Sequence, residues 1–385
     1  MKKINANRKM GLLLVLLIAT TLVAAGCTPA ATSETAVSET ITIAVTGPLS
    51  GDYAQYGEAF RNATELKATQ INESGGIDGQ QVELRFFDDQ NDSREAANIA
   101  QRLVDDQSIT AVIGPFSSTA ALAGAPIYQR GELVQLSPTA SHPDFTAQGS
   151  YMFRNINTQA TEGPIVADLL VNTLEAQQVA IIYINNDWGL TTKENVSNAI
   201  RDLGGEVVAE ESYMDGQSRD FNATLTRLAG INPDVIFVAG FYAETGAITQ
   251  QMRQLGIDIP LVGPSSLFNE ALIDLAGEAV EGLVVTSNFF PNEQDEMISA
   301  FVDAYREAYG STPNQFAAVA YDSLGMLAKA IEGAGSTNRE AVRNALAQLE
   351  NYPGVTGLTS FDENRDVIKN MTVLEIRDGE FRVRD

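Results

Sequence analysis

The sequence alternates short apolar strands with amphipathic helices, and this alternation runs through the chain twice. In the first run, strands are predicted at 41–45, 82–87, 109–114 and 133–137, separated by helices at 53–73, 94–106 and 119–129. In the second run, strands are predicted at 179–184, 206–213, 235–240 and 261–264. Strands this apolar, spaced by helices, are typical of parallel sheets covered on both faces. The pattern therefore predicts two α/β units in series.

The last hundred residues do not fit two simple sequential domains. Amphipathic helices are predicted within 293–310 and 316–335, and a strand-like hairpin tail follows at 370–385. The tail fits better if the chain crosses from one unit to the other near 286–290 and returns near 355–359.

The N-terminus has the order of a secretory signal peptide. A basic start, MKKINANRKM, precedes the apolar run GLLLVLLIATTLVAAG and then Cys27. The run is shorter than the roughly 20 residues that a membrane-spanning helix needs. Because VAAGC resembles a bacterial lipoprotein cleavage box, we expect 1–27 to be a lipoprotein signal peptide and Cys27 the lipidated residue. The alternative is an ordinary exported protein whose Cys27 has no role. Residues 28–40 are small and polar, as in a flexible tether.

Charge and motif content argue against several classes of function. The chain has 25 Lys and Arg against 50 Asp and Glu, so its surface repels phosphate backbones and nucleic-acid binding is not expected. A single cysteine excludes disulfides within the chain and thiolate metal sites. The sequence contains no P-loop, no G-x-G-x-x-G after a strand and no G-x-S-x-G elbow. We therefore expect no enzyme activity, no cofactor and no metal; the remaining enzymatic alternative is a hydrolase that uses His142, the sole histidine.

Three hydroxyl residues, Ser117, Ser118 and Thr119, stand together where a predicted strand passes into a helix, in VIGPFSSTAAL (112–122). The first N–H groups of a helix have no internal partner, and the helix dipole adds positive charge there, so the position suits a carboxylate. The alternative is a simple N-cap, worth about 1 kcal/mol. An N-cap uses only one hydroxyl, however, and three stand together here.

A second strand end repeats the theme, because Ser137, Thr139 and Ser141 lie in LVQLSPTASHP. Ligands of open parallel sheets bind beyond the carboxyl ends of the strands. Two hydroxyl-rich strand ends in one α/β unit therefore favour a site for an anion or a zwitterion.

Aromatic residues follow other strand ends. Tyr53 and Tyr56 come after the first strand, and Trp188, Phe241 and Tyr242 come after strands of the second unit. A single aromatic residue there is more often packing than a ligand contact. Several that converge on one cleft would suit a ligand with an apolar side chain.

From about residue 41 to its end the chain resembles type I solute-binding proteins of the branched-chain amino-acid kind, the extracytoplasmic receptors of ABC importers. The matching strings, in the order of that family, are TGPLSGDYAQYG, NESGGIDGQ, FFDDQND, VIGPFSSTAAL, LSPTAS and VGPSS. The resemblance implies two Rossmann-like lobes with parallel sheets, joined by three crossover segments. It places the first lobe at 41–155 and 289–355 and the second at 156–288 and 356–385.

The same resemblance implies a lipid-anchored, extracytoplasmic receptor that captures a small ligand and delivers it to a membrane-bound ABC permease. Its ligand is expected to be a branched-chain or related amino acid. The alternatives are an amide, a small carboxylic acid, or a sensing role in which the closed protein is presented to a membrane sensor.

The resemblance also suggests roles for individual residues. The ligand carboxylate would be held by Ser118 with help from Ser141, and the main chain at Thr139 would take part of the ammonium group. The complete predicted ligand-binding set is Tyr56, Ser117, Ser118, Thr119, Thr139, Ser141, Trp188, Phe241, Tyr242 and Ser265.

One position departs from the pattern of the family. Leucine-type members carry a glutamate that pairs with the α-ammonium group where this chain has Ser265 in VGPSS. A buried ammonium without a carboxylate is costly. Either another acid, such as Glu244 or Asp322, takes its place, or the ligand has no α-ammonium group.

Overall fold

The computed structural model describes residues 40–216, 218–291 and 294–384, which form one compact unit. The predicted signal peptide, Cys27 and nearly all of the predicted tether lie outside the described residues.

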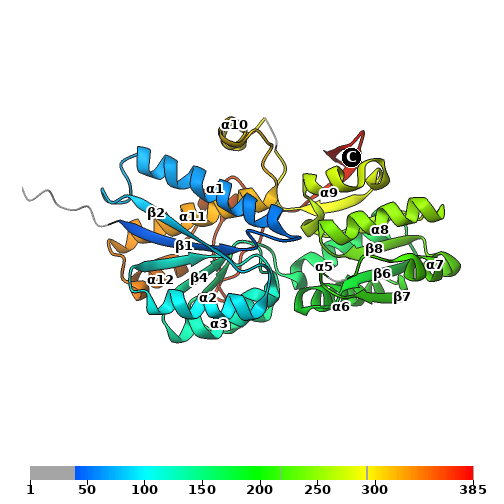
Figure 1. Cartoon of the computed structure of the whole chain (residues 1–385), viewed down its shortest axis with the longest axis horizontal. Coiled ribbons are helices and arrows are strands. Elements are labelled where there is room, and N and C mark those ends of the chain that lie inside the picture. Colours follow the sequence, from blue (N-terminus) through cyan, green and yellow to red (C-terminus); the bar gives the residue numbers. More distant parts are fainter. Residues whose placement is uncertain (1–39, 217, 292–293, 385) are drawn as a thin grey trace, which may run out of the picture. The chain divides into compact units, whose positions relative to one another are not determined.

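The first sheet has five parallel strands in the order β2-β1-β3-β4-β5 (Figure 1). Its strands are β1 (Ile41–Gly47), β2 (Val82–Asp88), β3 (Ile109–Ile113), β4 (Val134–Ser137) and β5 (Met152–Arg154). All but β2 are buried along their whole length, as expected of strands covered on both faces. Strand β5 was not predicted, because three residues are too few to show a period.

The second sheet has seven strands in the order β14-β13-β10-β9-β8-β6-β7. Five of them are parallel: β6 (Gln178–Ile184), β7 (Glu206–Tyr213), β8 (Val235–Ala239), β9 (Leu261–Gly263) and β10 (Val284–Ser287). The C-terminal hairpin of β13 (Thr372–Arg377) and β14 (Glu380–Val383) joins antiparallel to β10. The hairpin-like tail therefore extends the second sheet.

Helices cover both sheets. Those that accompany the first sheet are α1 (Ala54–Glu73), α2 (Ser93–Asp105), α3 (Ser118–Arg130), α4 (Asp144–Ala147), α11 (Gln315–Ala334) and α12 (Arg339–Ala347) (Figure 1). Those around the second are α5 (Gln159–Asp168), α6 (Asp187–Asp202), α7 (Asn222–Ile231), α8 (Tyr242–Leu255) and α9 (Glu270–Ala276). Helix α10 (Glu296–Tyr309) contacts α1, and a small hairpin pairs β11 (Tyr352–Gly354) with β12 (Gly357–Thr359). Side chains at the N-caps, such as Asp92 on α2, fix several helix starts.

The chain passes between the two lobes three times: after β5, after β10 and before β13. The crossovers are hydrogen-bonded to one another. Asn157 donates to the carbonyl of Lys369 (2.9 Å) and accepts from its N–H (2.7 Å), and Asn288 donates to the carbonyl of Asn370 (3.4 Å). The prediction of two α/β lobes with parallel sheets and three crossovers is therefore confirmed.

The exact lobe limits stay a prediction. The predicted return at 355/356 falls inside the β11–β12 hairpin. Beyond that hairpin, Phe361 still packs against Phe153 of β5, with ring centroids 5.1 Å apart, and Asp366 pairs with Arg154. We propose that the third crossover lies near 369–371.

A buried lysine and a buried aspartate lie beside this third crossover. The Lys369 ammonium donates to the hydroxyls of Thr356 (2.7 Å) and Thr359 (2.9 Å). Asp322 accepts from the N–H and the hydroxyl of Thr356 and from the N–H of Val355. Burial lowers the pKa of Lys369 from its ordinary 10.5 to about 8, and the charge of Asp322 opposes part of that shift.

Lys369 should make the stability of the protein depend on pH. Between about pH 8 and pH 10.5 the unfolded chain holds the Lys369 proton and the folded chain does not, so stability gains from rising pH in this window. We expect the unfolding free energy of the wild type, relative to Lys369→Met, to rise by up to about 1.4 kcal/mol per pH unit from pH 8 to 9.5. Urea unfolding at several pH values measures it. The exposed Lys329→Met is the control, and a pH-independent difference between wild type and Lys369→Met would contradict the expectation.

Candidate functional site

A small cavity of about 30 Å³ lies at the carboxyl ends of strands from both sheets. It is lined by Phe116, Ser117, Ser118, Thr139, Ser141, Ile156, Glu162, Trp188, Phe241, Ser265, Ser266, Gln315 and Phe316. The residues after β3 and β4 come from the first lobe, and those around α5, α6, β8 and β9 come from the second. A ligand in this cavity would therefore contact both lobes.

The turn after β3 requires a glycine. Gly114 has a φ of +117°, and a Cβ atom there would lie 2.2 Å from the carbonyl oxygen of Thr46. This turn carries Ser117 to the start of α3, where its hydroxyl oxygen accepts from the N–H of Ala120 (3.3 Å). The simple N-cap interpretation therefore holds for Ser117.

The hydroxyls of Ser118 and Ser141 accept from N–H groups that lie outside α3. The hydroxyl oxygen of Ser118 accepts from the N–H of His142 (3.2 Å), and that of Ser141 accepts from the indole N–H of Trp188 (3.1 Å). Within the described residues, neither hydroxyl donates its own proton to a protein acceptor. Both hydroxyls are buried in the cavity wall beside the N-terminus of α3. They form a pair of donors suited to an anionic group.

The remaining predicted hydroxyls join the two loops. Thr139 donates to the carbonyl of Phe116 (2.7 Å), and Ser137 donates to that of Pro115 (2.8 Å). The hydroxyl of Thr119 is buried without a hydrogen-bond partner, but Thr119 does not line the cavity.

Aromatic rings form the apolar wall. Trp188 stacks on Phe241 (5.0 Å between centroids), and Phe116, which was not predicted, lies 5.3 Å from Phe241. Tyr56 and Tyr242 lie behind this wall and do not line the cavity. The Tyr56 hydroxyl donates to the carbonyl of Ser266 (2.9 Å) and accepts from the N–H of Tyr242 (3.2 Å), so it links the lobes.

The structure thus brings seven of the ten predicted residues to the cavity: Ser117, Ser118, Thr139, Ser141, Trp188, Phe241 and Ser265. Tyr56, Thr119 and Tyr242 are adjacent to it. The roles of all ten residues as ligand contacts remain predictions.

Glu162 is the acid in the cavity, and the sequence analysis missed it. Its Oε1 atom accepts from the N–H of Ser265 (3.0 Å) and from the hydroxyl of Thr286 (2.9 Å). Burial raises its pKa, and these hydrogen bonds partly offset the rise. The available signal was helical spacing, because Glu162 shares the buried face of α5 with Gln159, Gly163 and Val166.

The two acids suggested by the sequence lie elsewhere. Asp322 is bonded near the third crossover, as described above, and Glu244 accepts from the hydroxyl of Tyr53 (3.0 Å) and lies 3.7 Å from Arg219. Neither lines the cavity. Arg219 also pairs with Asp52 of the first lobe, and Tyr242 donates to the carbonyl of Asp52 (2.6 Å), so this cluster joins the lobes at the edge of the site.

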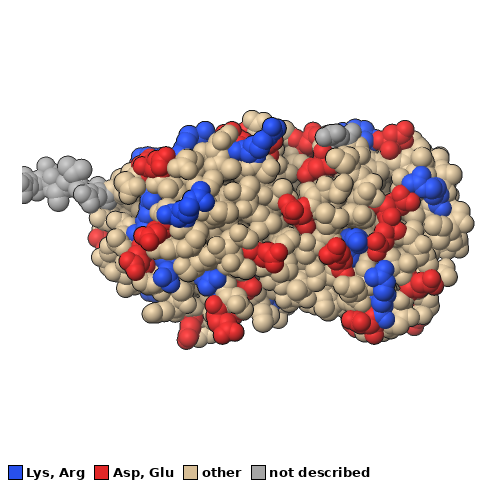
Figure 2. Space-filling model, turned by 90° about the horizontal axis from the view of Figure 1, so that it is seen from below, with Lys and Arg blue, Asp and Glu red and all other residues tan. Residues whose placement is uncertain are grey.

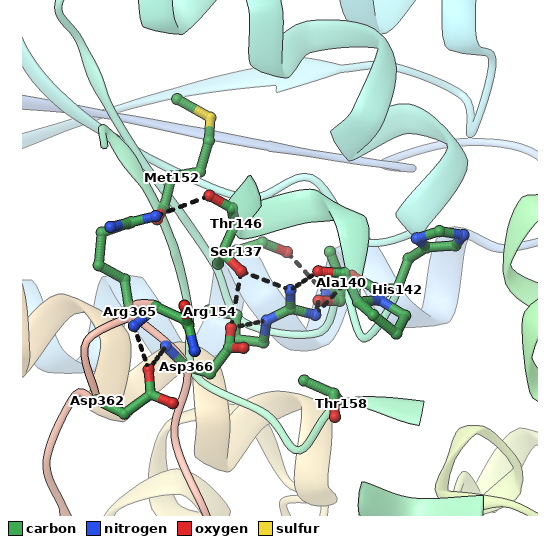
Figure 3. Close-up of polar contacts among 12 residues, drawn as sticks. Ser137, Ala140, His142, Thr146, Met152, Arg154, Thr158, Asp362, Arg365 and Asp366 are labelled. Atoms are coloured by element: carbon green, nitrogen blue, oxygen red, sulfur yellow. Dashed lines mark hydrogen bonds and ion pairs between the residues drawn. The ribbon is translucent and has the colours of Figure 1, made fainter. Parts of the chain in front are cut away.

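Arg154 is hydrogen-bonded to the loop at 140–143, which contains Ser141; Figure 3 shows Arg154 beside Ala140 and His142. Its fully buried guanidinium donates to the carbonyls of Ala140 (3.0 Å), His142 (2.8 Å) and Pro143 (3.2 Å). The same group pairs with Asp366 at 2.5 Å. The segment before the third crossover therefore helps to position a loop of the site.

Comparisons with known proteins identify the family. A sequence profile for periplasmic binding proteins matches residues 40–380. The chain belongs to this family. A leucine-, isoleucine-, valine-, threonine- and alanine-binding protein of Pseudomonas aeruginosa is 29% identical over 338 residues, which cover 87% of this chain and 89% of the relative.

Solved structures agree with this assignment. The branched-chain amino acid transporter substrate-binding protein LivJ of Streptococcus pneumoniae, in complex with isoleucine, has a TM-score of 0.84 and 31% identity, covering 90% of this chain and 99% of that one. A solute-binding protein of R. palustris in complex with benzoate has a TM-score of 0.83 at 20% identity, covering 89% and 95%, and shows the fold alone. As a periplasmic binding protein, the chain is an extracytoplasmic solute-binding protein.

Figure 2 shows acidic and basic side chains interspersed over the visible face, without a continuous basic stripe. Across the described part of the chain, no helix has both the length and the apolar character needed to cross a membrane.

Ser118 and Ser117 form a matched pair for testing the site. Because the Ser118 proton has no protein acceptor among the described residues, we expect Ser118→Ala to weaken ligand binding about 10-fold or more, as for loss of a hydrogen bond to a charged group. Ser117→Ala should in addition cost about 1 kcal/mol of stability, since its hydroxyl caps α3. Calorimetric titration and thermal unfolding of both variants measure this. Equal affinities for Ser118→Ala and wild type would contradict the assignment.

Proposed function

We propose that the protein captures a small ligand with a carboxylate, foremost a branched-chain or related amino acid, and delivers it to an ABC permease. The observation that carries the proposal is the pair of free hydroxyl protons on Ser118 and Ser141, next to the N-terminus of α3 and facing an aromatic wall. The amino-acid names of the Pseudomonas and Streptococcus relatives support the same ligand class.

The two lobes explain how capture occurs. Hydroxyls of the first lobe and the rings of Trp188 and Phe241 of the second line one cavity, so a ligand that contacts both favours the closed arrangement. The cavity volume of about 30 Å³ lies far below the roughly 300–1,000 Å³ of ordinary ligand pockets. Admission of an amino acid therefore requires the lobes or the wall side chains to move, and the crossovers would absorb a hinge motion. The permease would recognise the closed form of the protein.

Two alternatives keep the same fold. The ligand could be an amide or a carboxylic acid without an amino group, and the closed protein could signal to a membrane sensor instead of a permease.

An enzymatic role has little support: His142 does not line the cavity, and its Nδ1 atom accepts from the N–H of Asp144 (3.1 Å). We propose that the protein is not an enzyme and works without cofactor or metal.

Membrane anchoring rests on the sequence alone. We propose that Cys27 is the lipidated first residue of the mature protein. When the full chain is produced in a bacterial host with a labelled fatty acid, the label should follow the protein into the membrane fraction. Cys27→Ser should lose both label and membrane association; a variant that still carries the label would refute the anchor.

Trp188 provides a direct test of ligand capture, because it is the only tryptophan and lies in the cavity wall. The protein from residue 40 onward would be unfolded, dialysed to remove bound ligand, refolded and titrated with amino acids, their amides and their des-amino acids. We expect a saturable change in tryptophan fluorescence with at least one of these classes. The absence of saturation with every class, confirmed by calorimetry, would refute the proposed function.

A further inference from the structure

We propose that Glu162 is the counter-ion for a positively charged nitrogen of the ligand, so that the site selects a compact zwitterion over a simple carboxylic acid. The inference rests on the proposed function, because it assigns the second pole of the same cavity.

The hydrogen bonding of Glu162 leaves acceptor capacity on one carboxylate oxygen, Oε2, for the ligand. The Ser265 N–H and the Thr286 hydroxyl both donate to Oε1, and the Ser265 hydroxyl also interacts with the carboxylate. A carboxylate oxygen has two lone pairs, so these donors saturate Oε1. The side chain is only 7% exposed and lines the cavity, and Oε2 has at most the Ser265 hydroxyl as a protein donor, so it keeps a lone pair for a bound molecule.

The charge of Glu162 is not balanced by a nearby protein cation. Among the described residues, no lysine, arginine or histidine forms an ion pair with it, and no cation contributes to its pKa, which burial raises. An ionised carboxylate without a partner in such surroundings is costly. A ligand ammonium group placed against Oε2 would remove this cost.

The hydrogen-bond donors and the acceptor of the cavity come from different lobes. Donors without an acceptor, Ser118 and Ser141, belong to the first lobe, whereas the acceptor Glu162 belongs to the second. A ligand with a carboxylate and an ammonium close together would satisfy both and would link the lobes through charge.

Ser265 has a supporting role in this arrangement. Its N–H holds Glu162, and its carbonyl accepts from the side-chain amide of Gln315 (2.5 Å). Ser265 stands where leucine-type members of the family carry a glutamate, and here its N–H holds the carboxylate of Glu162 from α5. A cationic ligand group can therefore still find a carboxylate partner, although residue 265 is a serine.

The experiment compares leucine with 4-methylpentanoate, which lacks only the amino group, by calorimetric titration of wild type and Glu162→Gln. We expect the wild type to bind leucine at least about 30-fold more tightly than 4-methylpentanoate, as expected when a buried charge loses its partner. Glu162→Gln should lose at least about 30-fold in leucine affinity and little or nothing in 4-methylpentanoate affinity. Glu194→Gln, which removes an exposed charge from α6 of the same lobe, should leave both affinities within about 3-fold.

The outcomes are distinct. Equal binding of the two ligands by wild type, or an equal loss of both in Glu162→Gln, would overturn the inference while leaving a solute receptor in place. No binding of any amino acid, acid or amide by wild type would overturn the proposed function and the inference with it. If Glu162→Gln does not fold, Glu162→Asp keeps the charge but withdraws it, and its leucine affinity should fall between those expected for wild type and for Glu162→Gln.

Discussion

The parallel direction of the strands is the constraint on which the site depends. All strands of the first sheet and five of the second run parallel, so within each lobe their carboxyl ends meet at one edge. Loops that are distant in sequence are thereby collected into two small groups. The three crossovers then place both groups in a single compact unit, in which they line one cavity.

Hydrogen bonding divides residues of the same type into different roles. The Ser117 hydroxyl accepts from an N–H of its own helix, the Thr139 hydroxyl joins two loops, and the Ser118 hydroxyl accepts from the N–H of a neighbouring loop. Buried polar groups need partners, so a group of the cavity wall whose partners are incomplete is available to a ligand. The same reasoning separates Glu162, which lines the cavity and keeps acceptor capacity on Oε2, from Asp322, which lies outside the cavity and whose oxygens both accept from the chain.

Much of the architecture followed from the sequence, because apolar strands and amphipathic helices repeat over many residues. The predicted helix at 119–129 is α3 at Ser118–Arg130, and the predicted strand at 206–213 is β7 with the same limits. Strand β5 was missed because it is too short to show a period. Glu162 was missed for another reason: helical spacing places it on the buried face of α5, but only the facing residues, Ser265 and Thr286, show what it contacts.

The sequence by itself determined the two α/β units, the hydroxyl-rich strand ends and the family resemblance, since these depend on local pattern and order along the chain. Only the tertiary structure decided which hydroxyls keep a free proton, which aromatic rings face the cavity and which acid stands among them. Those properties arise from contacts between residues as far apart as Glu162 and Ser265, or Ser141 and Trp188. Burial, not composition, makes the charge of Glu162 costly, and burial is a property of the folded chain.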